Sequence, residues 1–88
     1  MPEAFTEAAI RVLQGLEPGE VVSYGEVAEQ AGFPGAARAV GNVLKTVDGL
    51  PWWRVVAANG RLVPGGEQRQ TELLKAEGVE VRNGRVAV

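Results

Sequence analysis

The sequence predicts a small α+β domain, with helices in its first half and short β-hairpins in its second half. Apolar residues recur at helical spacing up to residue 47, whereas β-forming residues and Asn-Gly turn pairs follow residue 51. The chain has 88 residues, so residues 1–88 are expected to form a single domain. A domain of this size buries about 60% of its unfolded surface, which leaves a modest core.

The first helix is expected over residues 3–16, where apolar residues form one stripe. Pro18 and Gly19 then mark a turn, and Val21 and Val22 form a short extended segment. The stripe consists of Phe5, Ala9, Val12, Leu13 and Leu16.

A helix-turn-helix is expected next. Ser23 is a typical N-cap residue and Glu26 completes a capping box, which predicts a short helix over residues 24–31. Gly32 ends this helix, and a second helix begins near Gly35. Two helices joined by a few residues that include a glycine are typical of a helix-turn-helix. The apolar stripe of the second helix consists of Ala36, Val40, Val43, Leu44 and Val47.

A β-hairpin is expected after the second helix. Residues 52–58 are rich in β-forming side chains, Asn59 and Gly60 form a strong turn signal, and residues 61–63 supply the return strand. A helix-turn-helix followed by a hairpin predicts a winged-helix-like domain.

The last part of the chain predicts one more helix and one more hairpin. The helix spans residues 68–77 and is expected to bury Leu73 and Leu74. The hairpin spans residues 79–88 and turns at an Asn-Gly pair, Asn83-Gly84.

The exposed face of the second helix is the first candidate for function. Arg38, Asn42 and Lys45 share this face, and the small residues Ala39 and Gly41 lie beside them. Because these side chains are small, another molecule can approach the helix backbone closely. The planar guanidinium of an arginine can then be inserted into a stack of bases. An ordinary solvated helix face gives the same pattern and is the more common explanation of it.

Tyr24 is the second candidate. It is the only tyrosine and begins the first helix of the pair, where its hydroxyl can reach a phosphate. The alternative is a half-buried tyrosine that packs on the hairpin.

The composition excludes several kinds of site. The chain contains no cysteine and no histidine, which excludes disulfides, Cys/His zinc sites, thiolate nucleophiles and the commonest general base. Ser23, the only serine, is explained by its capping position. We therefore expect no enzymatic activity, no metal and no cofactor.

No signal peptide or apolar run of about 18 residues is present, so a cytoplasmic protein is expected.

The charge is unevenly distributed. The net charge is −2, which argues mildly against a nucleic-acid partner, and residues 1–20 carry −3. Residues 35–70 carry five basic and two acidic side chains, which gives +3. A basic middle allows one face to bind DNA, with weak general attraction.

Three separate motifs carry a family resemblance. Residues 24–28 (YGEVA), 36–41 (AARAVG) and 51–56 (PWWRVV) resemble, in order and spacing, the DNA-binding domain of O6-alkylguanine-DNA alkyltransferases. The resemblance covers residues 3–79. At the position of the family's reactive cysteine the chain has Trp52, and at the following histidine it has Trp53. The chain therefore resembles the alkyltransferase-like proteins, which bind the lesion without repairing it.

The resemblance implies roles for individual residues. Arg38 matches the arginine that takes the place of the flipped nucleotide, Tyr24 matches the tyrosine that rotates its phosphate, and Trp52 becomes the pocket wall. Strand alternation would send Trp53 to the opposite side. Glu77 is interpreted as structural, as a partner of Arg54. The residues expected to contact DNA are Tyr24, Arg38, Ala39, Gly41, Asn42 and Lys45, and those expected to line the lesion pocket are Trp52, Arg54, Val63, Pro64 and Gly65.

The function expected from the resemblance is non-enzymatic recognition of O6-alkylguanine in duplex DNA. It implies minor-groove binding, base flipping and a hand-off to nucleotide-excision repair proteins, by a monomer at the nucleoid. The alternative is a winged-helix regulator that reads an undamaged sequence, usually as a dimer. The lesion hypothesis requires that Arg38 point outward and that a hollow open beside Trp52.

Overall fold

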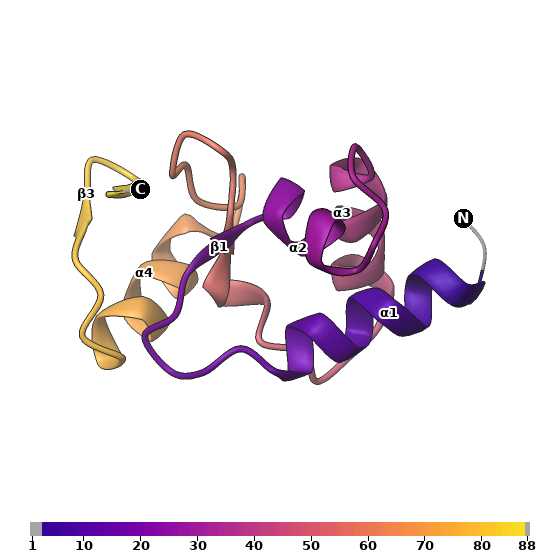
Figure 1. The fold of residues 1–88 in the computed structure, drawn as a ribbon. Coiled ribbons are helices and arrows are strands. Elements are labelled where there is room, and N and C mark those ends of the chain that lie inside the picture. Colours follow the sequence, from indigo (N-terminus) through magenta and orange to yellow (C-terminus); the bar gives the residue numbers. More distant parts are fainter. Residues whose placement is uncertain (1–2, 88) are drawn as a thin grey trace.

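The computed structural model describes residues 3–87 and has the α+β architecture expected from the sequence (Figure 1). Helices dominate the first half, and short strands join them to a smaller second half. Val88, expected in the return strand of the last hairpin, lies outside the described residues. The elements are α1 (Glu3–Gln14), β1 (Val22–Ser23), α2 (Tyr24–Gln30), α3 (Ala37–Thr46), a 3-10 turn η1 (Trp52–Arg54), β2 (Val55–Val56), α4 (Glu67–Ala76), β3 (Val81–Arg82) and β4 (Arg85–Val86).

Helices α1, α2 and α3 pack around the larger of two apolar clusters. The expected capping box starts α2: the Glu26 N–H donates to Ser23 Oγ (3.1 Å), and the Ser23 N–H donates to Glu26 Oε1 (2.8 Å). Phe5 is fully buried and meets the edge of Phe33 with 5.3 Å between ring centroids. The helix-turn-helix is therefore fixed on α1 by core packing, which leaves one face of α3 in solvent.

The first expected hairpin is wrong. Residues 52–54 form a 3-10 turn, and β2 pairs in parallel with β1, with Val22 opposite Val55. Asn59 and Gly60 do lie at a turn, but Arg61 forms its bridge with Arg85 of the last hairpin. Local turn chemistry was correctly identified, whereas a two-residue parallel pairing across more than thirty positions has no local sequence signal.

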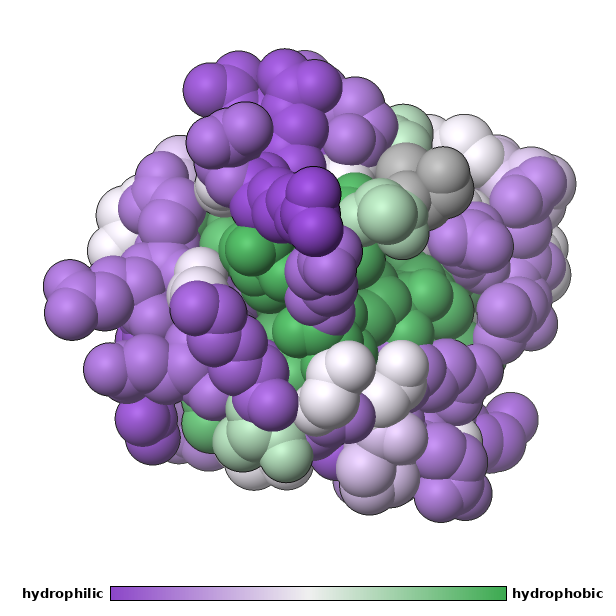
Figure 2. Space-filling model, turned by 90° about the vertical axis from the view of Figure 1, so that its left-hand side faces the viewer, coloured by the Kyte–Doolittle hydropathy of each residue, from purple (hydrophilic) through white to green (hydrophobic). Residues whose placement is uncertain are grey.

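The second half is built on α4 and the C-terminal hairpin of β3 and β4. Asn83 (φ 53°) and Gly84 (φ 72°) form the expected turn with two positive φ angles. The hairpin packs closely against the turn at Gly60. Only glycine fits there, because a Cβ would lie 2.1 Å from the Val86 carbonyl oxygen. On the face that carries α4 and the hairpin, Figure 2 shows an apolar floor ringed by hydrophilic side chains. The second apolar cluster belongs to this half of the molecule: its buried residues are Val56, Leu62, Leu74 and Val86, and the partly exposed Val21, Val79 and Val81 pack against them.

No helix within residues 3–87 has the length and apolar character needed to cross a membrane.

Candidate nucleic-acid interface

A hollow of about 590 Å³ opens between α3 and the residues around η1. Its volume lies in the range of small-molecule and cofactor pockets. One wall comes from α2 and α3, and the other comes from η1 and the loop that precedes α4. We call it the α3 hollow; it is lined by Tyr24, Ala37, Arg38, Gly41, Asn42, Leu44, Lys45, Trp52, Val63 and Pro64.

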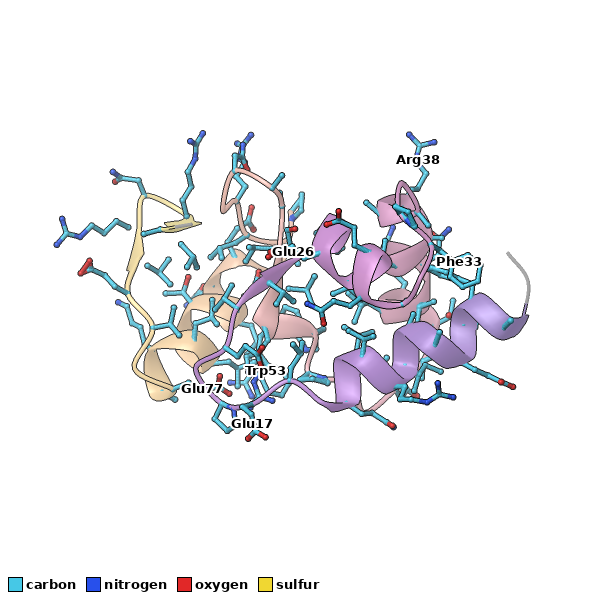
Figure 3. All side chains as sticks on the ribbon, in the orientation of Figure 1. Glu17, Glu26, Phe33, Arg38, Trp53 and Glu77 are labelled. Carbon is cyan, nitrogen blue, oxygen red and sulfur yellow. The ribbon has the colours of Figure 1, made fainter. Side chains whose placement is uncertain are left out.

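The exposed face of α3 supplies the cationic side of the α3 hollow. Arg38, Asn42 and Lys45 are all exposed and line it together, as their helical spacing predicts. Arg38 projects away from the body of the molecule (Figure 3). Around Gly41 the space is open, since a Cβ placed there would meet nothing within 4 Å. A bulky partner can therefore approach the α3 backbone closely here.

Tyr24 lies at the start of α2, half-buried against the larger core cluster, and lines the α3 hollow. Burial raises the pKa of its phenol above the ordinary value. The hydroxyl is therefore neutral at physiological pH and can donate a hydrogen bond. Its packing partner is the helical core, not a hairpin.

Trp52 forms the aromatic wall of the α3 hollow. Its six-membered ring lies 3.8 Å from the position that a Cβ on Gly66 would occupy. Trp53 meets it edge-on, at 6.3 Å between centroids and 90° between planes, and does not line the hollow. The two indoles diverge because successive residues of a 3-10 turn point about 120° apart, not because they alternate on a strand.

Gln70 holds the two sides of this wall together. It is fully buried in α4; its Oε1 accepts from the Val63 N–H (2.8 Å), and its Nε2 donates to the carbonyls of Trp53 and Val55 (3.1 Å each). One side chain thus joins the loop, η1 and β2. Gln70 could not be identified from the sequence, because nothing in its local pattern distinguishes a buried glutamine from an exposed one.

Arg54 is not a pocket residue, contrary to expectation. Its guanidinium binds Glu77, with Nη2 at 2.7 Å from Oε2, and donates to the Leu16 carbonyl. It also lies 5.1 Å from the centre of the Trp53 ring, in a cation–π contact. The Trp53 indole N–H donates to the same carboxylate at 2.8 Å. Figure 3 shows Trp53 and Glu77 on the side of the molecule opposite to Arg38.

The ion pair with Arg54 dominates the electrostatics of Glu77. Hydrogen bonding from Arg54 lowers the pKa of the Glu77 carboxyl to about 2, and the backbone N–H of Gly19 and the Trp53 indole act in the same direction. The hydrogen bonds between Arg54 and Glu77 also raise the pKa of Arg54. Glu77 is therefore an ionised structural group, as the sequence suggested.

Two other expected residues do not line the α3 hollow. Ala39 is partly buried on α3, and Gly65 lies in the loop next to Gly66 without contributing to the lining. Conversely, Ala37 and Leu44 line it although the sequence analysis did not select them. Their positions are i, i+4 and i+7 with Gly41, so helical spacing was the signal that would have found them.

Comparison with known proteins identifies the family. Residues 4–79 match the model of the 6-O-methylguanine DNA methyltransferase DNA-binding domain. The chain belongs to this family. It is 37% identical to a DNA base-flipping protein of Vibrio parahaemolyticus, over 98% of this chain and 92% of that protein. It is 36% identical to alkyltransferase-like protein 1 of Schizosaccharomyces pombe, over 92% of this chain and 81% of that protein.

The structural relatives agree with this assignment. The S. pombe Atl1 structure in complex with damaged DNA containing O6-carboxymethylguanine matches with a TM-score of 0.83 and 32% identity, over 93% of this chain and 82% of that one. A methyltransferase structure matches as well: that of Mycobacterium tuberculosis O6-methylguanine methyltransferase has a TM-score of 0.71 and 40% identity, over 83% of this chain. The chain spans 47% of that protein's chain. The fold of this family member is thus the DNA-binding fold of Atl1 and of the methyltransferases.

Proposed function

We propose that this chain binds O6-alkylguanine in duplex DNA, holds the base flipped into the α3 hollow and leaves it chemically unchanged. The observation that carries the proposal is the hollow itself, which joins the cationic face of α3 to the Trp52 wall. The names of the relatives, DNA base-flipping protein and alkyltransferase-like protein, support it. So does the structural match to Atl1 bound to damaged DNA.

The geometry suits the energetics of base flipping. Extruding a base costs a few kcal/mol, and less when its pairing is already weak. Alkylation at O6 removes the N1–H donor of guanine and blocks O6, so this base pair is weakened. In the proposed complex the planar guanidinium of Arg38, which is exposed and lines the hollow, fills the vacated stack. The DNA backbone around it would then be contacted by Tyr24, Gly41, Asn42 and Lys45, which also line the hollow.

Trp52 is the part of the hollow that would bind the extruded base. An aromatic contact contributes about 1–3 kcal/mol per stacked base. The apolar alkyl group adds burial against Trp52, Val63 and Pro64, at ~25 cal/mol per Å². A lesion is thereby favoured over guanine both in leaving the duplex and in being held.

The chain lacks the group needed for alkyl transfer. None of its 88 residues is cysteine or histidine, so it has neither a thiolate acceptor nor an imidazole base. A complex without chemistry leaves the lesion in place. We therefore propose that the bound site is passed to excision-repair proteins, and that the protein acts at the cytoplasmic nucleoid as a monomer.

Two matched duplexes test the function, one with O6-methylguanine and one with guanine at the same position. We expect tighter binding to the alkylated duplex at a stated salt concentration, and no transfer of a labelled methyl group to the protein. Equal affinities would overturn lesion recognition, and a preference for one undamaged sequence would favour a transcriptional regulator. Label on the protein would overturn the non-enzymatic part of the proposal.

A further inference from the structure

Three arginines form a row across the C-terminal hairpin and the segment beside it. Arg82 pairs with Arg85 in the β3–β4 hairpin, and Arg85 also forms an antiparallel bridge with Arg61. Directly opposed residues of antiparallel segments place their side chains on the same face. All three residues are exposed. The arginine row, Arg61–Arg85–Arg82, is thus a continuous cationic strip.

The row faces away from the core. Leu62 and Val86, the neighbours of Arg61 and Arg85, are 4% and 7% exposed and point into the second apolar cluster. Because successive side chains in an extended segment alternate, the arginines point outward. Hydrogen bonds from Leu62 N–H to the Gly84 carbonyl (3.2 Å) and from Val86 N–H to the Gly60 carbonyl (2.9 Å) fix the row's backbone.

The row begins next to the α3 hollow. Val63 lines the hollow and lies two residues after Arg61 on the same loop. The 57–66 loop and the C-terminal hairpin lie on the side of the molecule from which Arg38 projects (Figures 1 and 3). The long axis of the molecule measures 35 Å, which equals about ten base pairs of duplex.

The charges of the row are mostly uncompensated within the protein. Arg82 pairs with Glu80 at 3.1 Å, whereas Arg61 and Arg85 pair with no carboxylate among the side chains that the structure describes. Like charges placed directly opposite each other destabilise a strand pair. The chain nevertheless has two such pairs in succession, although its net charge is negative. A bound anion relieves this repulsion.

We propose that the arginine row binds backbone phosphates of the duplex flanking the flipped base. The proposal rests on the proposed function, because the α3 hollow sets where the duplex lies. Two of its three residues, Arg82 and Arg85, lie in β3 and β4, outside the family's matched segment, which ends at residue 79. Phosphate contacts contribute affinity and register but no preference for the lesion.

The test is the salt dependence of binding by the double variant Arg61→Gln/Arg85→Gln. Loss of two phosphate contacts should reduce the slope of log K against log salt by about 2, because each contact contributes about 0.9. Affinity for alkylated and unmodified duplexes should fall by the same factor. Both side chains are exposed, and backbone hydrogen bonds hold the hairpin, so the variant is expected to fold. Arg11→Gln, on α1, is the matched control and should leave the slope unchanged.

Duplex length provides a second measurement. Shortening the duplex on the side of the row should lower the slope more for the wild-type protein than for the double variant, which keeps only Arg82 of the row. An unchanged slope in the double variant, or an equal decrease in Arg11→Gln, would overturn the proposal. Failure of the proposed function is separate: it would be seen as equal wild-type affinity for alkylated and unmodified DNA, whatever the slope.

Discussion

In the proposed mechanism, base extrusion depends on Arg38. Its guanidinium is exposed and lines the α3 hollow, so its removal should not disturb the fold. We expect Arg38→Ala to weaken binding to alkylated duplex at least tenfold, about 1.4 kcal/mol. The fluorescence of a base analogue in the duplex should show reduced extrusion. Arg38→Lys keeps the charge but not the stacking plane, and should recover the salt dependence without the extrusion. Normal extrusion by Arg38→Ala would contradict the assignment.

The position of a side chain could be predicted from the sequence where it follows from helical spacing. Arg38, Asn42 and Lys45 fall together because 3.6 residues per turn dictate it. The prediction failed for Arg54, which was expected to line the lesion pocket, although its pairing with Glu77 was also expected. The direction of a long side chain is decided by its partner, and here Glu77 lies on the other side of η1.

At the scale of elements, the α3 hollow depends on α4 holding η1 and the 63–64 loop in place. Gln70→Leu keeps the volume but leaves the Val63 N–H and the carbonyls of Trp53 and Val55 without their partner. Each of the three losses costs about 1–3 kcal/mol, so we expect a decrease of at least about 3 kcal/mol in the free energy of unfolding, measured with urea. The preference for alkylated over unmodified duplex should also fall.

Gln68→Leu is the control for this prediction, because Gln68 is exposed on the same helix. It should change the free energy of unfolding by less than about 0.5 kcal/mol. If both leucine variants have the same stability and the same preference for alkylated duplex, Gln70 does not keep η1 and the 63–64 loop in position.

The helices and the last hairpin were predictable because their signals are local. The capping box at Ser23 and the Asn83-Gly84 turn are each read within four residues. The parallel pairing of β1 with β2 was not predictable, because it joins two dipeptides that are distant in sequence and stabilised by burial. The error in the first hairpin follows from this: once Val55 and Val56 pair with β1, the segment after Gly60 pairs with β4 instead.

At the scale of the whole molecule, Glu77 connects parts of the chain that are distant in sequence. Its carboxylate accepts from the Gly19 N–H, from Trp53 in η1 and from Arg54, which in turn donates to the Leu16 carbonyl. The Glu77 carboxylate therefore joins three parts of the chain: the end of α4, the turn η1, and the segment that follows α1. Both side chains of the ion pair are only 13% exposed, so the pair is shielded from solvent.

The pH dependence of stability should report this anion. The pKa of Glu77 is about 2 in the folded protein, against 4.5 ordinarily, so the folded state favours the ionised form. Its contribution is complete above about pH 4.5 and is lost as the pH falls towards 2. Glu77→Gln should cost about 3 kcal/mol at pH 7 and flatten the stability profile between pH 4.5 and 2. Urea unfolding at a series of pH values measures both effects.

A surface carboxylate separates this effect from general charge repulsion at low pH. Glu72 pairs with Arg69 at 3.5 Å, but the two side chains are 58% and 68% exposed, so Glu72→Gln should cost less than about 1 kcal/mol. It should also keep the wild-type profile between pH 4.5 and 2. A profile flattened equally in both variants would show that net charge, and not the junction at Glu77, controls the acid stability of the molecule. A flattened profile in Glu77→Gln alone would show that the ionised Glu77 carboxylate, which binds Gly19, Trp53 and Arg54, controls the stability of the molecule in acid.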